Sequence, residues 1–340
     1  MMKIMRILLF PIAILYGLIV GLRNFLFDVN FLKSFEFDTT IICVGNLNVG
    51  GTGKSPQIEY LIRLLSDKYN VATLSRGYKR ESNGFLLANA DSNAKILGDE
   101  PFQFYSKFKK ILVSVDAVRK NGIENLLSLP QKPDVILLDD AFQHRKVKAG
   151  FYILLTSYND LYCDDFILPT GNLRESRSGS QRANLIIVTK CPKNLSEIEQ
   201  EKIRKKLNIS SNQDLFFSFI DYDEQIYSEL NTLNISEIIN QEKVLLAGIA
   251  NPKPFFEFLK LSNDTVLEYP DHYNFNKNDI EKIRNLSENK KIITTEKDYV
   301  RLKSENIKNL YYLPIKSSFL NQSKQFDDLI LNFISKRILQ

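Results

Sequence analysis

Short apolar runs recur along the chain and alternate with stretches whose apolar residues have helical spacing. Six runs in the first two thirds have the character of strands: residues 40–44, 71–74, 111–115, 134–139, 151–156 and 184–189. Nearly continuous apolar runs are typical of strands buried on both faces of a parallel sheet. After the first run, one helical face is formed at i, i+3, i+4 and i+7 by Ile58, Leu61, Ile62 and Leu65. The alternation predicts a three-layer α/β/α domain with right-handed crossovers.

A second series of runs predicts a further, smaller α/β domain. Its strands are expected at 244–250, 265–269, 291–295 and 309–315. The aromatic segment 215–230 is strand-like and links the two domains, and residues 322–338 have the pattern of an amphipathic C-terminal helix. The expected domains are therefore an apolar N-terminal segment (1–36), a core domain (37–212) and a second α/β domain with linker and C-terminal helix (213–340).

The N-terminal segment carries an uncharged apolar run at residues 7–22, between Arg6 and Arg23. Sixteen residues fall short of the eighteen expected of a clear membrane-spanning helix, and no small-residue cleavage site follows. The pattern favours a helix lying at the membrane interface, and the alternative is a helix packed on the protein's own core. Whether the helix spans the bilayer or lies flat stays open. Four aromatic residues extend the apolar surface: Phe25, Phe27, Phe31 and Phe35.

Overall charge and cysteine usage narrow the class of protein only slightly. The net charge of +5, from 45 basic and 40 acidic residues, does not indicate nucleic acid and is compatible with an anionic membrane surface. The odd number of cysteines, without a C-x-x-C pair, indicates a reducing compartment. No cluster of Cys and His indicates a metal site, and no obligate protein partner is expected.

A glycine-rich loop follows the first strand, in the stretch "VGNLNVGGTGKSP". Gly53, Lys54 and Ser55 match the end of the phosphate-loop pattern, but Asn48 stands where its first glycine is expected. Strand, loop and helix in this order still predict a nucleotide site, in which Lys54 neutralises the β- and γ-phosphates and Ser55 contacts Mg²⁺. The residues expected to hold the nucleotide are Asn48, Val49, Gly50, Gly51, Thr52, Gly53, Lys54 and Ser55.

An acid pair ends a buried strand in "DVILLDDAFQHR". Asp139 or Asp140 would hold Mg²⁺ directly or through water, because a strand-end carboxylate does so in phosphate-loop enzymes. Which of the two contacts the metal stays open. Gln143 and His144 follow on the same loop and are expected to project toward the site, although His144 is equally interpreted as a structural histidine.

Other charged residues have two interpretations each. Asp99 and Glu100 begin a predicted helix, where they are either ordinary caps or a general base and Mg²⁺ contacts. Arg119 and Arg174 are either solvated or phosphate ligands. His272, in "YPDHYNF", is either structural or a partner of Asp99 in a base near neutral pH.

Taken together, the motifs resemble those of the tetraacyldisaccharide 4′-kinase family. The resemblance runs through nearly the whole chain: "VGNLNVGGTGKSP", "LSRGY", "GDEP", "DVILLDDAFQHR", "LPTGNLRES", "VTK", "AGIANPKPFFEFL", "DHYNF" and "TTEKDYVRL". Val49 stands where partitioning and switch ATPases carry a signature lysine, which argues against that alternative class. "VTKCP" and "TEKD" are only partial matches to the base-reading motif of GTPases.

The resemblance implies a reaction and a set of roles. ATP binds the phosphate loop, and its γ-phosphate passes to the 4′-hydroxyl of an acylated glucosamine disaccharide 1-phosphate at the cytoplasmic face of the inner membrane. Ser55, Glu100 and the acid pair manage Mg²⁺. Asp99 and His272 form a dyad that deprotonates the sugar hydroxyl. Four further residues are implied to line the site: Arg119, Gln143, His144 and Arg174.

The chain departs from the family pattern in a few places. Ser55 replaces the usual Thr and keeps the hydroxyl. Ala141 stands where Gly is common, which restricts the backbone of a loop beside the metal. Thr170 and Ser176 stand where Ala and Pro are common. None of these changes removes a group with a proposed chemical role.

Overall fold

The computed structural model describes residues 6, 8–271 and 273–338 and divides the chain into two compact units. The first unit is Met1–Ile220 with Ser317–Gln340, and the second is Asp221–Lys316. The chain leaves the first unit in β8 (Asp214–Tyr222) and returns to it in β15 (Ile315–Phe319). The second unit is therefore inserted into the first along the sequence.

The first unit is built on one mixed sheet, which in the described residues has nine strands in the order β15-β8-β7-β6-β1-β5-β2-β4-β3. From β8 to β4 neighbouring strands pair in parallel, and β3 pairs antiparallel with β4. The six strands predicted from the apolar runs are confirmed. Their bounds, with that of β3, are β1 Thr40–Asn46, β2 Val71–Ser75, β3 Leu86–Leu87, β4 Leu112–Val115, β5 Val135–Asp139, β6 Phe151–Ser157 and β7 Leu185–Thr189.

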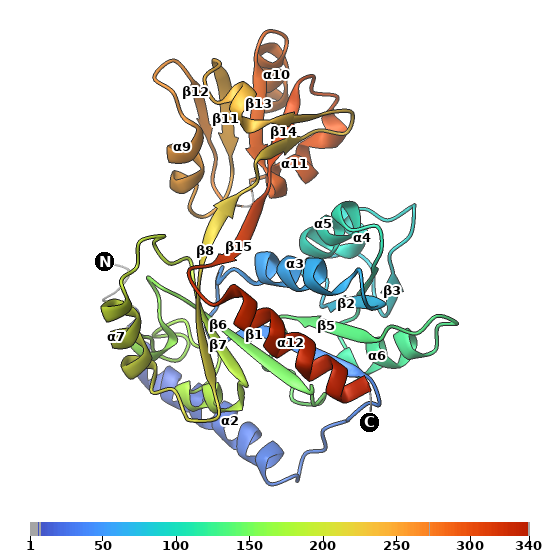
Figure 1. Cartoon of the computed structure of the whole chain (residues 1–340), viewed down its shortest axis with the longest axis vertical. Coiled ribbons are helices and arrows are strands. Elements are labelled where there is room, and N and C mark those ends of the chain that lie inside the picture. Colours follow the sequence, from blue (N-terminus) through green and yellow to red (C-terminus); the bar gives the residue numbers. More distant parts are fainter. Residues whose placement is uncertain (1–5, 7, 272, 339–340) are drawn as a thin grey trace. The chain divides into compact units, whose positions relative to one another are not determined.

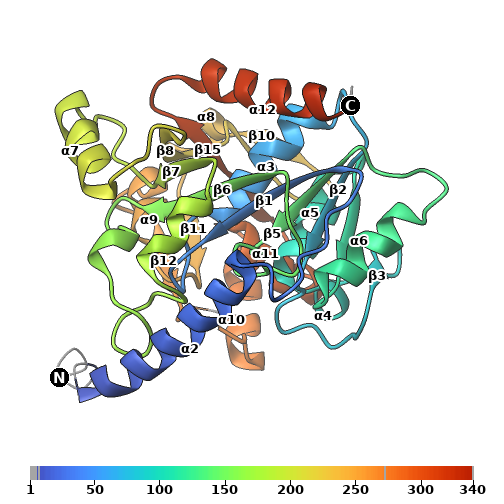
Figure 2. The ribbon, with the colours of Figure 1, turned by 90° about the horizontal axis from the view of Figure 1, so that it is seen from below.

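Helices cover both faces of this sheet (Figures 1 and 2). On one face α3, α5 and α12 contribute to the hydrophobic core, and α6 and α7 pack against the other. The predicted apolar face of α3 is fully buried in the first of these cores. The helices are α2 Phe10–Asp28, α3 Lys54–Leu65, α4 Ala94–Leu97, α5 Asp99–Lys107, α6 Arg119–Leu127, α7 Glu197–Leu207 and α12 Ser323–Ile338, with 3-10 turns η1 Tyr162–Asp164 and η2 Arg177–Arg182.

The C-terminal helix α12 lies in a different unit from the one expected. The sequence pattern grouped it with the second domain, whereas Phe326, Ile330 and Ile334 are fully buried in the core that also contains β1 and α3. Tyr60 of α3 donates a 2.8 Å hydrogen bond to Asp327. A sequence pattern gives the buried face of a helix but not the surface on which that face packs.

The second unit has its own sheet, with strands in the order β10-β9-β14-β13-β11-β12. β12, β11, β13 and β14 are parallel, and β9 and β10 extend the sheet antiparallel. The predicted strands are again confirmed, and the aromatic linker divides into β8 and β9. The bounds are β9 Gln225–Tyr227, β10 Thr232–Asn234, β11 Lys243–Ala247, β12 Thr265–Glu268, β13 Lys291–Thr295, β14 Leu310–Leu313, α8 Ile235–Ile238, α9 Lys253–Leu259, α10 Lys277–Ser287, α11 Glu296–Leu302 and η3 Lys303–Glu305.

The N-terminal apolar segment forms α2, which leaves most of its apolar side chains exposed. Ala13 and Phe27 are buried against the first unit. Of the helices in the described residues, α2 alone is long and apolar enough to cross a membrane, with a mean hydropathy of 1.7 and 11% of that window buried. A helix serving its own core would bury these side chains. The exposed apolar side chains are Leu8 and Leu9, just before α2, and Phe10, Ile12, Ile14, Leu15, Leu18, Ile19, Leu22 and Phe25 of the helix.

Candidate active site

The glycine-rich loop joins β1 to α3 and is held in place by a contact from β7, which is separated from β1 by β6. Gly50 (φ 121°) and Gly53 (φ 84°) adopt left-handed backbone conformations that favour glycine. Thr189, at the end of β7, donates a 2.8 Å hydrogen bond to the Thr52 carbonyl. The loop therefore opens onto the N-terminus of α3, whose first amides have no partner within the helix and attract phosphate oxygens.

Asn48, which stands in place of the first glycine of the phosphate-loop pattern, has a structural role. Its side chain is buried, and Nδ2 donates a 3.0 Å hydrogen bond to Oδ2 of Asp165. Next to it, the Val49 amide donates to the carbonyl of Asn172 at 2.7 Å. Asparagine in place of glycine thus fastens the phosphate loop to residues 165–174, the segment that also carries Arg174.

The side chains of Lys54 and Arg174 both contact the carboxylate of Asp140. Its backbone is left-handed (φ 49°), directly after β5. Oδ1 lies 3.7 Å from Nζ of Lys54 and 2.8 Å from Nη1 of Arg174, which is also 3.0 Å from Oδ2. Burial alone would raise the pKa of Asp140, but the charges of Lys54 and Arg174 outweigh it and lower the pKa below its usual value. The carboxylate is therefore ionised and holds both cations beside the loop.

Asp139 has the environment of a cation ligand. Its Oδ2 accepts a 3.2 Å hydrogen bond from Ser75, whereas its buried Oδ1 has no hydrogen-bond partner among the described residues. Burial, together with the charges of Asp140 and Glu100, raises the pKa of Asp139 to about 6. A nearby divalent cation would relieve both the missing contact and the charge repulsion, so these residues fit Mg²⁺.

The acidic side chains that the structure describes do not complete a metal coordination shell by themselves. In the part of the chain that the structure describes, no three His, Cys, Asp or Glu side chains gather closely enough to hold a metal. Mg²⁺ in phosphoryl transfer takes one or two protein carboxylates and completes its shell with water and substrate phosphates, so a site for it does not require such a cluster.

The side chains of Arg119 and Gln143 donate hydrogen bonds to backbone carbonyls near the phosphate loop and the acid pair. The guanidinium of Arg119 is buried and donates to two backbone carbonyls, those of Asp116 at 2.7 Å and Asp139 at 3.1 Å. Gln143 Nε2 donates to the carbonyl of Asn46, the last residue of β1, at 2.9 Å. Both side chains thus hold the ends of β1 and β5, which carry the phosphate loop and the acid pair.

His144 is half-buried on the same loop and stays neutral. Burial and the positive charges of Arg119, Arg76 and Arg23 lower the pKa of His144 to about 4. At neutral pH the ring is therefore an uncharged donor and acceptor. Ala141, which stands where Gly is common in the family, does not strain the backbone of this loop, because the residue with the left-handed conformation is Asp140, not Ala141.

Asp99 and Glu100 form the first turn of α5, after Gly98 (φ 94°). The negative charge of Glu100 contributes to the raised pKa of Asp139. His272, the proposed partner of Asp99, lies outside the described residues.

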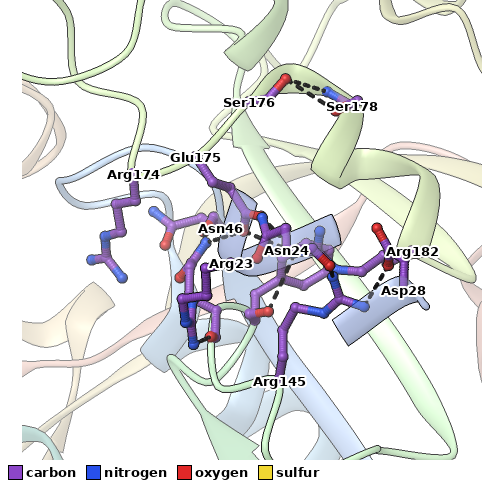
Figure 3. Close-up of polar contacts among 12 residues, drawn as sticks. Arg23, Asn24, Asp28, Asn46, Arg145, Arg174, Glu175, Ser176, Ser178 and Arg182 are labelled. Carbon is purple, nitrogen blue, oxygen red and sulfur yellow. Dashed lines mark hydrogen bonds and ion pairs between the residues drawn. The ribbon is translucent and has the colours of Figure 1, made fainter. Parts of the chain in front are cut away.

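A buried carboxylate at the site, Glu175, has no counterpart among the sequence predictions. It accepts hydrogen bonds from Gln143 and, as Figure 3 shows, from Asn24 of α2 and from Arg182. Its neighbour Arg174 was predicted because guanidinium groups bind phosphate. A buried glutamate on a loop has no sequence signal beyond its position next to that arginine.

The arrangement defines a class of enzyme. A phosphate loop at the end of a central parallel strand, a loop lysine and a strand-end acid pair beside it are the parts of a phosphate-loop enzyme that transfers a nucleotide's phosphoryl group.

Comparison with known proteins identifies the family. The profile of the family described as "LpxK: Tetraacyldisaccharide-1-P 4'-kinase" matches residues 5–335. Curated proteins named tetraacyldisaccharide 4'-kinase are 64% identical in Flavobacterium johnsoniae, covering 99% of both chains, and 45% identical in Bacteroides thetaiotaomicron, covering 96% of this chain and 92% of that protein. The chain belongs to the tetraacyldisaccharide-1-P 4'-kinase family and is an ATP-dependent kinase of lipid A biosynthesis.

The fold agrees with a solved member of the same family. The crystal structure of the "apo" form of LpxK from Aquifex aeolicus, in complex with ATP, superposes with a TM-score of 0.78 at 29% identity, covering 97% of this chain and 99% of that chain. The fold class expected from the sequence is thereby confirmed.

Proposed function

We propose that phosphoryl transfer in this chain takes place beside Asp140, among the groups that converge there. The observation that carries the proposal is the pairing of one carboxylate with Lys54 and Arg174 at the mouth of the phosphate loop. The triphosphate of ATP would lie along residues 48–55, with Lys54 against the β- and γ-phosphates. Arg174 would meet the charge that develops on the transferred group.

The chemical step needs a base for the acceptor. Asp99 accepts the proton of the sugar 4′-hydroxyl while that oxygen bonds to the γ-phosphorus, and the bond from phosphorus to the β,γ-bridging oxygen breaks to release ADP. Support for this role comes from the family resemblance and from the position of Asp99 at the start of α5. The same resemblance gives His272 the role of raising the basicity of Asp99.

Magnesium fits the acid pair. Asp139 and the hydroxyl of Ser55 would hold it, with Asp140 and Glu100 contributing through bound water, and its chemistry would be to neutralise the charge of the β- and γ-phosphates. The support is the buried Oδ1 of Asp139, which has no hydrogen-bond partner among the described residues.

The acceptor proposed for this chain is a lipid, and α2 provides a surface for meeting it. Its exposed apolar face would lie in the cytoplasmic leaflet of the inner membrane, with Arg23 near the headgroups. An apolar pocket of about 440 Å³ opens between α2 and residues 165–177, lined by Ala13, Gly17 and Ile167 among others. Such a pocket has the lining and volume that an acyl chain requires.

The base is tested by Asp99→Ala and His272→Ala, assayed by transfer of labelled γ-phosphate to a tetraacyldisaccharide 1-phosphate in detergent micelles. Asp99→Ala should lower kcat by about a hundredfold or more and leave ATP affinity within about twofold, because general-base catalysis contributes about 10²–10⁴. An Asp99→Ala enzyme that keeps most of its turnover refutes the assignment.

Membrane docking is tested by Leu15→Glu and Leu22→Glu, both on the exposed face of α2. Each charge should reduce co-sedimentation with vesicles of phosphatidylethanolamine and phosphatidylglycerol, because it places a carboxylate among the acyl chains. Ile198→Glu is the matched control, since Ile198 is an equally exposed apolar residue of α7. Unchanged sedimentation of both α2 variants would show that this face does not enter the bilayer.

A further inference from the structure

The carboxylate of Glu175 has its hydrogen-bonding capacity filled. Its exposed fraction is 1%, and four hydrogen bonds reach it. Oε1 accepts from Gln143 Nε2 at 2.9 Å and from Arg182 Nη2 at 2.8 Å. Oε2 accepts from Asn24 Nδ2 at 2.8 Å and from Arg182 Nη2 at 2.9 Å. A buried charge held by three side chains is costly to displace, so it fixes the positions of all three.

The surrounding backbone leaves just enough room for this carboxylate. A Cβ atom at Gly179, in η2, would lie 2.9 Å from Oε2 of Glu175 and 3.1 Å from Nη1 of Arg182. Glycine at this position lets η2 approach closely enough for Arg182 to pair with the buried charge.

One of the groups bonded to Glu175, Gln143, leads to the phosphate loop. Gln143 Nε2 donates both to Glu175 and to the carbonyl of Asn46. Asn46 in turn accepts a 3.3 Å hydrogen bond from Nζ of Lys54 and donates to the carbonyl of Asn48 at 2.7 Å. A continuous chain of polar contacts therefore runs from Glu175 to the loop lysine.

A second of these groups, Asn24, belongs to α2. Asn24 lies near the end of that helix, and a second contact from the same helix reaches the next residue, since Tyr16 donates a 3.0 Å hydrogen bond to the carbonyl of Arg174. On its other side, the amide of Arg174 donates to the carbonyl of Leu47 at 2.8 Å. The backbone of Arg174 is thus held between the apolar helix and the phosphate loop.

We propose that Glu175 is a positioning residue that couples the seating of α2 to the placement of Arg174 against Asp140, so that docking of α2 on a membrane activates the kinase. A helix with an exposed apolar face is held at a depth set by the bilayer, and Asn24 and Tyr16 transmit that position to the loop. Coupling of this kind changes activity by roughly 0.5–2 kcal/mol, or about two- to thirtyfold.

The test separates activation by the membrane from the reaction itself. The acceptor is a short-chain, water-soluble disaccharide 1-phosphate, and kcat is measured without and with empty vesicles of phosphatidylethanolamine and phosphatidylglycerol. Vesicles should raise the kcat of the wild type by about threefold or more and should not raise that of Glu175→Gln. Equal activation of both proteins, or none in the wild type, overturns the proposal.

Docking itself is followed separately. The chain contains no tryptophan, so Phe25→Trp, on the exposed face of α2, gives a fluorescence signal that reports vesicle binding. The binding curve should be the same with Glu175 and with Glu175→Gln. A variant that loses activation because it no longer binds vesicles would contradict the coupling role.

Asn24→Ala removes the contact from the helix side and decides the question if Glu175→Gln does not fold. On its own it should reduce the activation by vesicles; where Glu175→Gln does fold, adding Asn24→Ala to that variant should change the activation by less than about 1.5-fold. Full activation of Asn24→Ala overturns the proposal. Glu36→Gln, at an exposed pair with Lys148, is the matched carboxylate control and should be activated like the wild type.

This inference rests on the kinase activity of the site. The two fail in different ways: a wild type that transfers no phosphate refutes the activity, whereas an active wild type with unchanged variants refutes only the coupling.

Discussion

Gly45 is the second-to-last residue of β1, just before the phosphate loop. Its replacement tests whether the loop and the acid pair depend on close packing at the end of this strand. A Cβ atom built there lies 2.6 Å from Cβ of Phe142 and 3.0 Å from its backbone nitrogen. Ordinary contacts of this kind begin near 3.4 Å, so Gly45→Ala requires a local separation of about 0.8 Å. Phe142 is itself buried, so the strain falls on the backbone that follows Asp140 and Ala141.

The expected cost follows from that geometry. Overpacking of a well-packed interior costs about 1–3 kcal/mol. At about 2–4 °C per kcal/mol for a domain of this size, Gly45→Ala should melt several degrees below the wild type. Turnover should fall as well, because the shift moves the acid pair away from Lys54, and misplacement by about 1 Å costs up to a hundredfold.

The assay is thermal unfolding of the purified protein together with kcat in micelles. Gly21→Ala is the matched control, because a Cβ at Gly21, on α2, has nothing within 4 Å. Removing a helical glycine there should be neutral or stabilising by about 0.5–1 kcal/mol. If Gly45→Ala melts with the wild type and keeps its turnover, the reasoning about this contact is wrong.

Three further predictions concern buried and half-buried titratable groups. Glu59, which pairs with Lys107 of α5 at 2.7 Å, is 1% exposed, so Glu59→Ala should destabilise the first unit by about 3 kcal/mol, measured by denaturant unfolding. Because the pKa of His144 is lowered to about 4 in the folded protein, this histidine contributes its full stabilisation above its unfolded pKa near 6.5 and loses that contribution as pH falls toward 4. Over that interval the unfolding free energy of His144→Gln should therefore decline less than that of the wild type. In the second unit, Asp264→Ala leaves the buried Lys243 without its 2.9 Å ion pair, so hydrogen exchange there should accelerate while that of the first unit is unchanged.

Much of the fold was predictable because buried parallel strands have a strong apolar signal. The strands from β1 to β7, with the exception of the two-residue β3, follow from that signal. The strand β15 was not predicted: the run expected at 309–315 covers β14 and ends at Ile315, and neither apolar content nor spacing shows that the chain changes sheets after Pro314. The position of α12 in the first unit depends on a contact between residues 60 and 327, which no local pattern contains.

The candidate site was predictable where chemistry leaves a spacing in the sequence. The loop lysine and the strand-end acids have such a spacing, and the structure brings Lys54 and Asp140 together. Whether they perform the roles proposed for them remains a prediction. Glu175 and Asn46 were not predicted, because their importance comes from burial and from partners far away in the sequence, and those exist only in the folded chain.

The late position of α12 in the chain has a consequence for biosynthesis. A ribosome completes the phosphate loop early, but Phe326, Ile330 and Ile334, which fill the core beneath α3, emerge only after the whole second unit has been made. Until then the nascent first unit exposes an unfilled apolar face, and chaperones bind such faces. The cell therefore cannot obtain a finished nucleotide site from an interrupted translation product, even one that contains every residue of the loop and of the acid pair.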